Sequence, residues 1–158
     1  MKISDKLNDK TIIASLKGTN RSEVIDEMLS HLVKESYLMG SIKLFSFIEN
    51  NESINNSADS IGIAFPHSTS IEIDDLVCIL GLSTNGILYN EEDVHPCHII
   101  LLSLSPKNNP DMHRKFISKF RLLLSDIHLK DKIINAGSVI SVRDLLSNWD
   151  QKEMEEEL

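Results

Sequence analysis

The sequence predicts an α/β protein in which helices flank both faces of a central mixed β-sheet. Residues 76–82 and 97–104 are almost continuously apolar, as expected for strands in the middle of a sheet that is covered on both sides. Segments with apolar residues at helical spacing lie before and after these strands and would supply the covering helices. A chain of 158 residues is normally one domain, so we assign residues 1–150 to a single domain.

The composition narrows the classes of partner and the compartment. The net charge of −8 argues against nucleic acid or an anionic membrane as the main partner. No apolar run approaches the length of a membrane span, and the first residues lack a signal-peptide core, so we expect a cytoplasmic protein without membrane insertion. Cys78 and Cys97 lie in the apolar runs, which favours reduced, buried thiols over a disulfide. Residues 151–158 are an acidic tail, which we expect to be a frayed, solvated helix end.

The N-terminal part is predicted to form a strand and two helices. Residues 11–16 have the composition of a short strand. Asn20 is the expected N-cap of the first helix, with Glu23 completing a capping box and Gly40 ending the element. The apolar stripe of this helix comprises Val24, Ile25, Met28, Leu29, Leu32 and Val33. A second helix should begin near Ser41. Its inward-facing residues are Leu44, Phe45 and Ile48.

The middle of the chain contains a polar loop followed by a short strand. Residues 50–60 (NNESINNSADS) are rich in turn formers and predict a loop. The loop leads into an apolar strand at residues 61–65. Pro66 cannot donate a ladder hydrogen bond, so strand pairing should stop there and leave His67 just past the carboxyl end of the strand. Residues 83–96 predict an excursion at the sheet edge between the two long apolar strands.

A prolyl break and a helix follow the last strand. Residues 106–110 should end the strand and start a helix. Asn109 is the expected N-cap, and Pro110 is the expected first helical residue. The apolar stripe of this helix is Phe116, Ile117, Phe120 and Leu123 or Leu124. A step of three residues back from Phe116 places His113 on the same inward face, in the first turn.

The C-terminal part is predicted to contain two more helices. The first covers residues 127–136 and ends at Gly137, and the second covers residues 142–149 with Ser141 as its cap. The predicted order of elements is therefore β-α-α-β-β-β-α-α-α.

His67 and His113 are the residues best placed for chemistry. Both are predicted at element ends that face the same edge of the sheet, where ligands collect in open α/β folds. An unprotonated imidazole is a nucleophile, and a second imidazole beside a helix N-terminus would stabilise the oxygens of a transferred phosphoryl group. The structural alternative is that each residue is simply a histidine at the edge of the core.

The segment Gly62-Ile63-Ala64-Phe65-Pro66-His67 resembles a motif of the enzyme IIA domain of the bacterial phosphoenolpyruvate-dependent phosphotransferase system, in its fructose, mannitol and nitrogen-regulatory branch. That family continues with two apolar strands, a loop containing proline and a helix whose first turn holds a second histidine. Residues 76–82, 97–104 and 106–110 and His113 follow in this order. The resemblance covers nearly the whole chain and implies the mannitol- and fructose-type enzyme IIA fold.

The resemblance also implies residue roles and partners. His67 would be the phosphorylated residue, accepting the phosphoryl group from the histidine of an HPr-type carrier protein. It would pass the group to a cysteine of an enzyme IIB domain, or hold it as a regulatory mark that is recognised by a regulated target protein. His113 would orient His67 and contact the phosphoryl oxygens. The resemblance implies neither a cofactor nor a metal.

Three parts of the sequence depart from the family pattern. The family has an arginine about 16 residues before the histidine, and Asn51 stands there, so the cation is missing. The family's Thr-Gly-(Ile/Val)-Gly stretch is replaced by residues 57–60 (SADS), in which Ser57 keeps a hydroxyl and Asp59 adds a negative charge near the expected site. The glycine after the histidine is Ser68. These differences indicate slow or specialised phosphoryl transfer.

A metal site is the competing interpretation of one short segment. His95-Pro96-Cys97-His98 places three metal-ligating residue types within four residues. Adjacent strand residues such as Cys97 and His98 point to opposite faces, so we expect no metal to be bound.

The sequence as a whole therefore favours a phosphocarrier of the enzyme IIA type. The given sequence contains no fused IIB or IIC segment, which favours a nitrogen-regulatory type over direct sugar import. The alternative is a non-catalytic regulatory module that binds its partners through the same surface with an impaired phosphoryl relay.

Overall fold

The computed structural model describes residues 1–59, 61–90, 92–93 and 95–157. Ser60 of the predicted loop and Leu158 of the predicted tail lie outside the described residues. The helices are a short 3₁₀ helix, η1 (Ile3–Asp5), and α1 (Arg21–Lys34), α2 (Ile42–Ile54), α3 (Asp111–Leu124), α4 (Ile127–Ile134) and α5 (Val139–Glu156). The strands are β1 (Ile12–Ile13), β2 (Ile63–Ala64), β3 (His67–Ser70), β4 (Val77–Ile87) and β5 (Cys97–Pro106).

The sheet is mixed and is built around the two long strands β4 and β5. These strands pair antiparallel, and β1 runs parallel to β4 on the outer side. On the other side, β2 and β3 both run parallel along β5, with Ile63 opposite Ile99 and His67 opposite Ser103. The apolar runs thus predict the two central strands correctly, and the predicted mixed sheet is confirmed.

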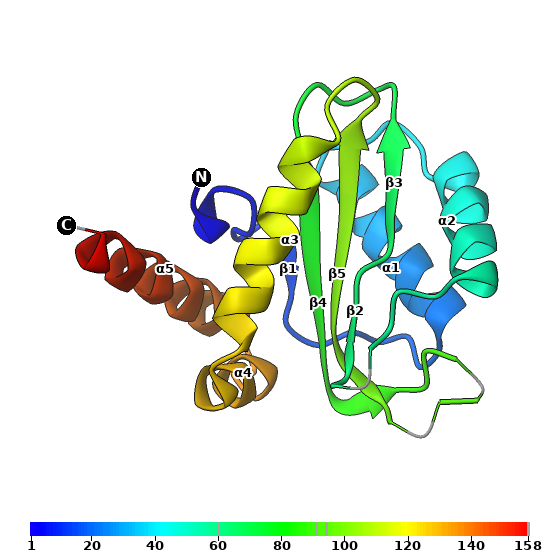
Figure 1. Cartoon of the computed structure of the whole chain (residues 1–158). Helices are drawn as coiled ribbons and strands as arrows, with labels where there is room; N and C mark the ends of the chain where they lie inside the picture. The colour runs from blue at the N-terminus through cyan, green and yellow to red at the C-terminus, as the bar shows by residue number, and fades with distance from the viewer. Residues whose placement is uncertain (60, 91, 94, 158) are drawn as a thin grey trace.

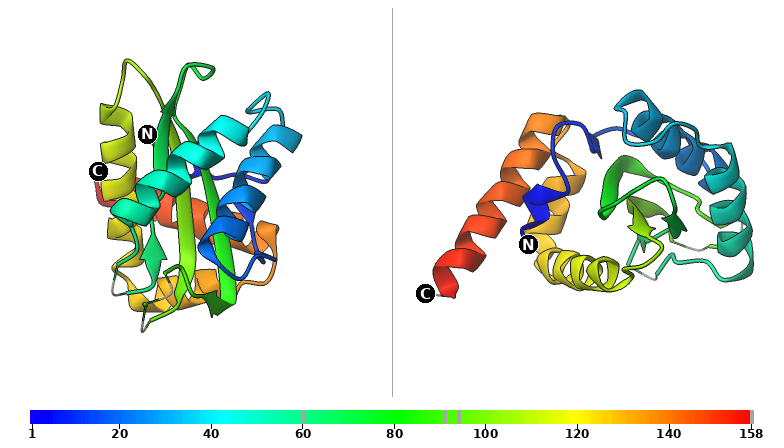
Figure 2. Two further views of the ribbon diagram at one scale, coloured as in Figure 1. Left: turned by 90° about the vertical axis from the view of Figure 1, so that its right-hand side faces the viewer. Right: turned by 90° about the horizontal axis from the view of Figure 1, so that it is seen from above.

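Helices cover both faces of the sheet, as the apolar strands require. Helices α1 and α2 lie on one face, and η1, α3, α4 and α5 lie on the other (Figures 1 and 2). The inward residues of β5 alternate between the two cores, with Leu101 in the core under α3 and Leu102 in the core under α1. The central parts of β4 and β5 are therefore buried on both faces, which explains their unbroken hydrophobic runs.

The ends of the first two helices differ from the prediction. Asn20 does cap α1, and its side chain accepts a hydrogen bond from the backbone of Glu23. The helix ends at Lys34 rather than Gly40, because Ser36 takes a left-handed conformation with φ of 68° and breaks the helical hydrogen bonding. Helix α2 begins after Ser41 as predicted but runs through Ile54, so Asn51 lies on a helix and not in a loop.

The predicted strand around Pro66 is divided in two. Pairing is interrupted at Phe65 and Pro66, and it resumes at His67, which is the first residue of β3. The prediction that His67 lies past the end of the strand is wrong, because the Pro66 carbonyl still accepts a hydrogen bond from the Ser103 amide at 3.1 Å and keeps the chain beside β5. The excursion predicted from residue 83 also starts late, since β4 continues to Ile87 with a register shift after Leu82.

The C-terminal helices are displaced or longer than predicted. Helix α3 begins at Asp111 with Pro110 as the capping residue, one position later than the sequence indicates. Ser138, rather than Ser141, caps α5, because Gly137 with φ of +76° turns the chain immediately before it. Helix α5 then continues to Glu156, so residues 151–156 are regular helix where fraying was expected.

Helix α5 is tied to the N-terminus by one buried carboxylate. Asp150 is 4% exposed and accepts hydrogen bonds from the Ile3 and Ser4 amides at 2.9 and 2.8 Å. Figure 2 shows the C-terminal end of α5 projecting away from the other elements. None of the helices in the described ranges is long and apolar enough to cross a bilayer.

Candidate functional site

The two histidines singled out by the sequence lie side by side. His67 opens β3 and is exposed, while His113 lies in the first turn of α3 and is half-buried. Their rings stack, with the centroids 4.7 Å apart and the planes inclined by 29°. The fold achieves this because β3 runs along β5 and α3 follows β5 after residues 107–110; the three elements are labelled in Figure 1.

A buried hydroxyl group holds the ring of His113. The Oγ atom of Ser103 lies 2.8 Å from Nδ1 of His113. Ser103 is 1% exposed and lies on β5 directly opposite His67 in the strand register. The side chain of this one serine therefore lies between the strand of His67 and the helix of His113, and it leaves Nε2 of His113 free for another contact.

The environment keeps the imidazole of His113 neutral. Burial lowers the pKa of His113 from 6.5 to about 4, and the positive charges that His67 and Arg114 can carry act in the same direction. At neutral pH the ring therefore carries one N–H proton and one lone pair. Such a ring can donate a hydrogen bond without carrying charge.

The C-terminal end of α2 forms the other side of His67. A cavity of about 290 Å³ is lined by His67, Asn51, Glu52, Ile54, Asn55 and Ser57. Asn51, the residue that replaces the family's arginine, therefore lines the same cavity as His67. The described lining carries amides, a hydroxyl and a carboxylate, and no Lys or Arg side chain.

A buried carboxylate braces this side of the site. Glu52 is 4% exposed, and its two oxygens accept hydrogen bonds from the amide and the hydroxyl of Ser57, both at 2.6 Å. The Ser57 hydroxyl oxygen in turn accepts a hydrogen bond from the Phe65 amide at 2.9 Å. The chain Glu52–Ser57–Phe65 fixes the backbone just before His67, which explains why a hydroxyl is retained at Ser57.

Asp59 is used within its own turn rather than at the histidines. One oxygen accepts hydrogen bonds from the Ile61 and Ile63 amides, each at 3.1 Å, and the other lies 3.7 Å from Nη1 of Arg121. The Arg121 guanidinium also lies over the Phe65 ring, 4.3 Å from its centroid. The negative charge that the sequence suggested near the phosphoryl site is therefore engaged by backbone amides and paired with a cation from α3.

The segment proposed as a metal-site alternative is divided between two environments. Cys97 is buried in the core under α1 and α2, whereas Nδ1 of His98 lies 2.9 Å from the Ser83 carbonyl oxygen. Within residues 1–59, 61–90, 92–93 and 95–157, no three His, Cys, Asp or Glu side chains are grouped to hold a metal ion.

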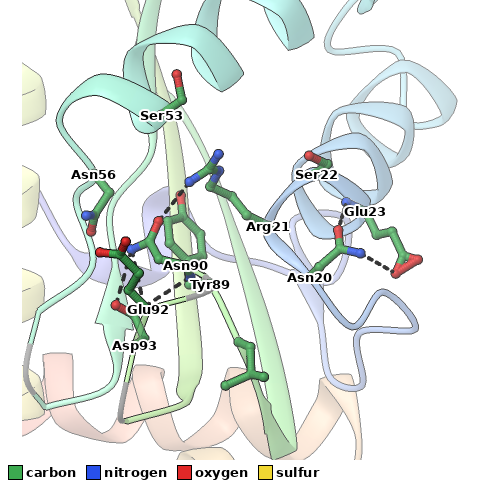
Figure 3. A pocket seen from close by; sticks show the side chains of 11 residues that line it. Asn20, Arg21, Ser22, Glu23, Ser53, Asn56, Tyr89, Asn90, Glu92 and Asp93 are labelled. Atoms are coloured by element: carbon green, nitrogen blue, oxygen red, sulfur yellow. Dashed lines mark hydrogen bonds between the residues drawn. The ribbon is translucent and has the colours of Figure 1, made fainter.

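A second cavity has a different character. It has a volume of about 820 Å³ and is bordered by the N-terminus of α1 and the polar segment after β4 (Figure 3). Its one basic side chain in the described lining, Arg21, donates hydrogen bonds to Glu49 and Asn90. The lining also contains the carboxylates of Glu23, Glu92 and Asp93. This excess of negative charge disfavours a phosphoryl group there.

Sequence reasoning missed two residues: Ser103, which contacts His113, and Arg121, which contacts Asp59 and Phe65. Ser103 has a recognisable signal, because it is a polar residue at an inward position of an otherwise apolar strand. Arg121 has no such signal in the sequence, because its spacing places it on the polar face of α3. Only the fold brings its guanidinium over the Phe65 ring.

Comparison with known proteins assigns the chain to a family of phosphotransferase components. Residues 5–149 match the family model described as "Phosphoenolpyruvate-dependent sugar phosphotransferase system, EIIA 2". The chain therefore belongs to this EIIA family, and the resemblance inferred from the sequence is confirmed at that level. Family membership supports a phosphocarrier role.

Individual relatives agree with the family. The fructose-specific EIIABC component of the phosphotransferase system of Bacillus subtilis (strain 168) is 26% identical over 151 residues, which is 96% of this chain and 24% of that protein. The chain thus spans about a quarter of the length of that relative.

Solved structures share the fold at low sequence identity. The nitrogen regulatory protein IIA-Ntr from Neisseria meningitidis superposes with a TM-score of 0.79 at 19% identity, over 91% of this chain and 98% of that one. IIA mannitol from Escherichia coli superposes with a TM-score of 0.73 at 21% identity, over 89% of this chain and 99% of that one. A chain in the complex of enzyme IIA mannitol with phosphorylated enzyme IIB mannitol from Escherichia coli superposes with a TM-score of 0.74 at 20% identity. The match covers 90% of this chain and 98% of that one.

Proposed function

We propose that this protein is an enzyme IIA-type phosphocarrier that accepts a phosphoryl group on His67 from an HPr-type protein. The phosphoryl group then passes to a cysteine of an enzyme IIB domain or remains as a regulatory signal. The observation that supports this most directly is the stacked pair of His67 and His113, with His113 held by Ser103. We further propose that residues 1–150 act as one enzyme IIA-like unit in the cytoplasm.

The proposed transfer exchanges one phosphorus–nitrogen bond for another. A lone pair of the neutral His67 ring attacks the phosphorus atom of the carrier's phosphohistidine, and the carrier's imidazole leaves with the electrons of the broken bond. The attacking nitrogen of His67 carries no proton, and the N–H proton on its other nitrogen stays in place. The carrier's phosphohistidine reacts with its own second nitrogen protonated, so that a neutral imidazole leaves and the positive ring charge passes to phospho-His67. Exposure of His67 is needed because the donor is itself a protein side chain.

His113 supplies a neutral hydrogen-bond donor next to the accepting ring. Its position in the first turn of α3 also brings the positive end of the helix dipole to the same place. The negative charge on the phosphoryl oxygens is thereby stabilised without a lysine or arginine on the α2 side.

The choice of partner rests on relatives rather than on this chain. The Escherichia coli complex pairs an enzyme IIA with a phosphorylated enzyme IIB, which supports a IIB-type cysteine as the acceptor. We favour the nitrogen-regulatory type, because the side of His67 that lacks a cation would suit a slow signal better than a rapid sugar relay. The similarity to a fructose-specific protein supports the competing assignment to sugar transport.

One observation favours a second candidate function. The cavity beside His67 contains Asn51 where the family has arginine, together with the Glu52 carboxylate. A site with this charge balance suits a protein-binding regulatory module whose phosphoryl relay is impaired.

The test is reconstitution of the relay. The purified chain is incubated with phosphoenolpyruvate, enzyme I and HPr-type carriers of its own organism, and the gain of one phosphoryl group is followed by intact mass. Fragment masses should place the group on His67. Onward loss of the label to a IIB domain would identify a relay, a stable label would identify a regulatory mark, and no label would favour the binding module.

A further inference from the structure

We propose that Ser103 is a positioning residue that fixes the tautomer of His113, so that the neutral ring donates a hydrogen bond from Nε2 to the phosphoryl group on His67. This inference deepens the proposed function and rests on it. It assigns a role to a residue that contacts neither the phosphoryl group nor the partner.

Ser103 is a buried polar residue on the face of β5 that packs under α3. The neighbouring residues on the same face, Ile99 and Leu101, are fully buried in the core under α3. Ser103 continues this face, is 1% exposed, and directs its hydroxyl to Nδ1 of His113 at 2.8 Å. Burying a hydroxyl group costs free energy unless a hydrogen bond offsets its desolvation, and His113 supplies that bond for Ser103.

The hydrogen bond permits two proton arrangements, and the geometry distinguishes them. If Nδ1 carried the ring proton, Ser103 would accept, and its own hydroxyl hydrogen would need another acceptor. In the part of the chain that the structure describes, His113 is the one side-chain or backbone partner found for Ser103 Oγ. The hydroxyl therefore donates to the Nδ1 lone pair, since the other arrangement would bury an unpaired donor.

The consequence falls on the opposite nitrogen of His113. A neutral imidazole whose Nδ1 accepts a hydrogen bond carries its proton on Nε2. Because burial lowers the pKa of His113 to about 4, the ring remains neutral at pH 7, and the location of this single proton decides whether it donates or accepts. A ring with a lone pair on Nε2 would repel the phosphoryl oxygens, whereas the Nε2–H group attracts them.

The first experiment reads the tautomer directly and requires no phosphoryl transfer. The chain is labelled with ¹⁵N-histidine, and the ring nitrogens of His113 are assigned by long-range ¹H–¹⁵N correlation at pH 7. The expected result is a protonated Nε2 and an unprotonated Nδ1 in the wild type, with a mixture of tautomers in Ser103→Ala. A protonated Nδ1 in the wild-type chain would overturn the proposal even if Ser103→Ala did not fold.

The second experiment connects the tautomer to the transfer rate. We expect Ser103→Ala to slow single-turnover phosphorylation of His67 about tenfold and Ser103→Thr, which keeps the hydroxyl, to restore most of the rate. Ser105→Ala is the matched control, because Ser105 lies two residues further along the same face of β5, is 5% exposed, and is opposite Thr69 rather than His67. An equal loss of rate in Ser103→Ala and Ser105→Ala would mean a general packing effect and would overturn the role of Ser103.

The two experiments separate this proposal from the proposed function. A wild-type chain with the Nε2–H tautomer that accepts no phosphoryl group would overturn the phosphocarrier function, and with it the use of this tautomer in transfer. A wild-type chain that is phosphorylated normally but has the Nδ1–H tautomer would overturn only the role of Ser103.

Discussion

The two sides of His67 are built in opposite ways. On the α3 side, His113 is half-buried, neutral and held by the buried hydroxyl of Ser103. On the α2 side, the residues that share a cavity with His67 are polar, and the residue at the position of the family's cation is Asn51. The buried Glu52 on that side is bonded to Ser57 rather than turned to the histidine.

The difference indicates separate roles for the two sides. The α3 side carries the hydrogen-bond donors next to His67, and the α2 side holds the backbone that precedes His67. The α2 side fixes the backbone before His67 through Ser57 and Phe65, and this requires acceptor groups rather than cations. Under the proposed function, the α3 side would supply most of the stabilisation of the phosphoryl charge, through His113 and the helix N-terminus. Each variant below tests one part of this comparison.

The largest effect is expected at the residue that both sides share. His67→Ala should abolish phosphoryl gain in the reconstituted relay, because no other imidazole takes its place at the start of β3. The fold should be unaffected, since His67 is exposed and contributes little buried area. His128→Ala, which removes another exposed histidine, is the control in the same intact-mass measurement. Labelling of the His67→Ala chain would contradict the assignment of the accepting residue.

Removal of the donor on the α3 side should give the next largest effect. Loss of one well-aligned donor to developing negative charge typically costs ~10²–10³ in rate. We therefore expect His113→Ala to fold and to be phosphorylated on His67 about that much more slowly, measured under single-turnover conditions with excess phosphorylated carrier. An unchanged rate would mean that His113 only fills space beside His67.

The neutrality of the α3 side can be tested through the pH dependence of stability. Because the pKa of His113 is lowered from 6.5 to about 4 by folding, the unfolded chain binds more protons between these values. The folded state should lose on the order of 2–3 kcal/mol from this residue as the pH falls from 7.5 to 4. His113→Gln does not titrate at this position. Its free energy of unfolding, measured in urea at both pH values, should therefore fall by that much less between pH 7.5 and pH 4. Parallel pH profiles for the two chains would show that His113 is not desolvated.

The central sheet was predictable because strands that are buried on both faces have continuous runs of apolar residues. Residues 76–82 and 97–104 lie within β4 and β5 apart from Leu76, and the capping of α1 by Asn20 follows from local hydrogen bonding alone. Strand β3 was missed because its sequence, HSTS, is polar, and only pairing with β5 makes it a strand. The last turn of α2 was missed for a similar reason, since Glu52 is buried there by its contacts with Ser57.

The pairing of the histidines was only partly visible in the sequence. The helical spacing from Phe116 places His113 on the inward face, and the predicted strand end brings His67 to the same edge. The stacking itself depends on β3 continuing along β5 past Pro66, which the proline seemed to forbid. The hydrogen bond from Ser103 joins two elements, and a sequence read one element at a time does not reveal such a contact.

The smallest effect is expected on the α2 side, where a cation can be restored. Asn51 is exposed and lines the cavity next to His67, so Asn51→Arg would place a guanidinium near the phosphoryl oxygens. An exposed charge pair contributes about 0.2–1 kcal/mol. Since 1.36 kcal/mol corresponds to a factor of ten in rate, phosphorylation should be about 1.4- to fivefold faster. Asp59 should be left unchanged, because its carboxylate holds the turn before β2.

The control for this variant is provided by the neighbouring residue. Asn50→Arg changes the net charge of the chain equally, but Asn50 is not part of the cavity lining, since it lies about 100° further around α2. The rate of phosphoryl gain is measured for both variants at a fixed concentration of phosphorylated carrier and at constant salt. An acceleration specific to Asn51→Arg would show that the α2 side limits the natural rate. Equal acceleration by both variants would instead indicate long-range attraction of the carrier, and no acceleration would mean that the α3 side already supplies all the stabilisation that the transferred group requires.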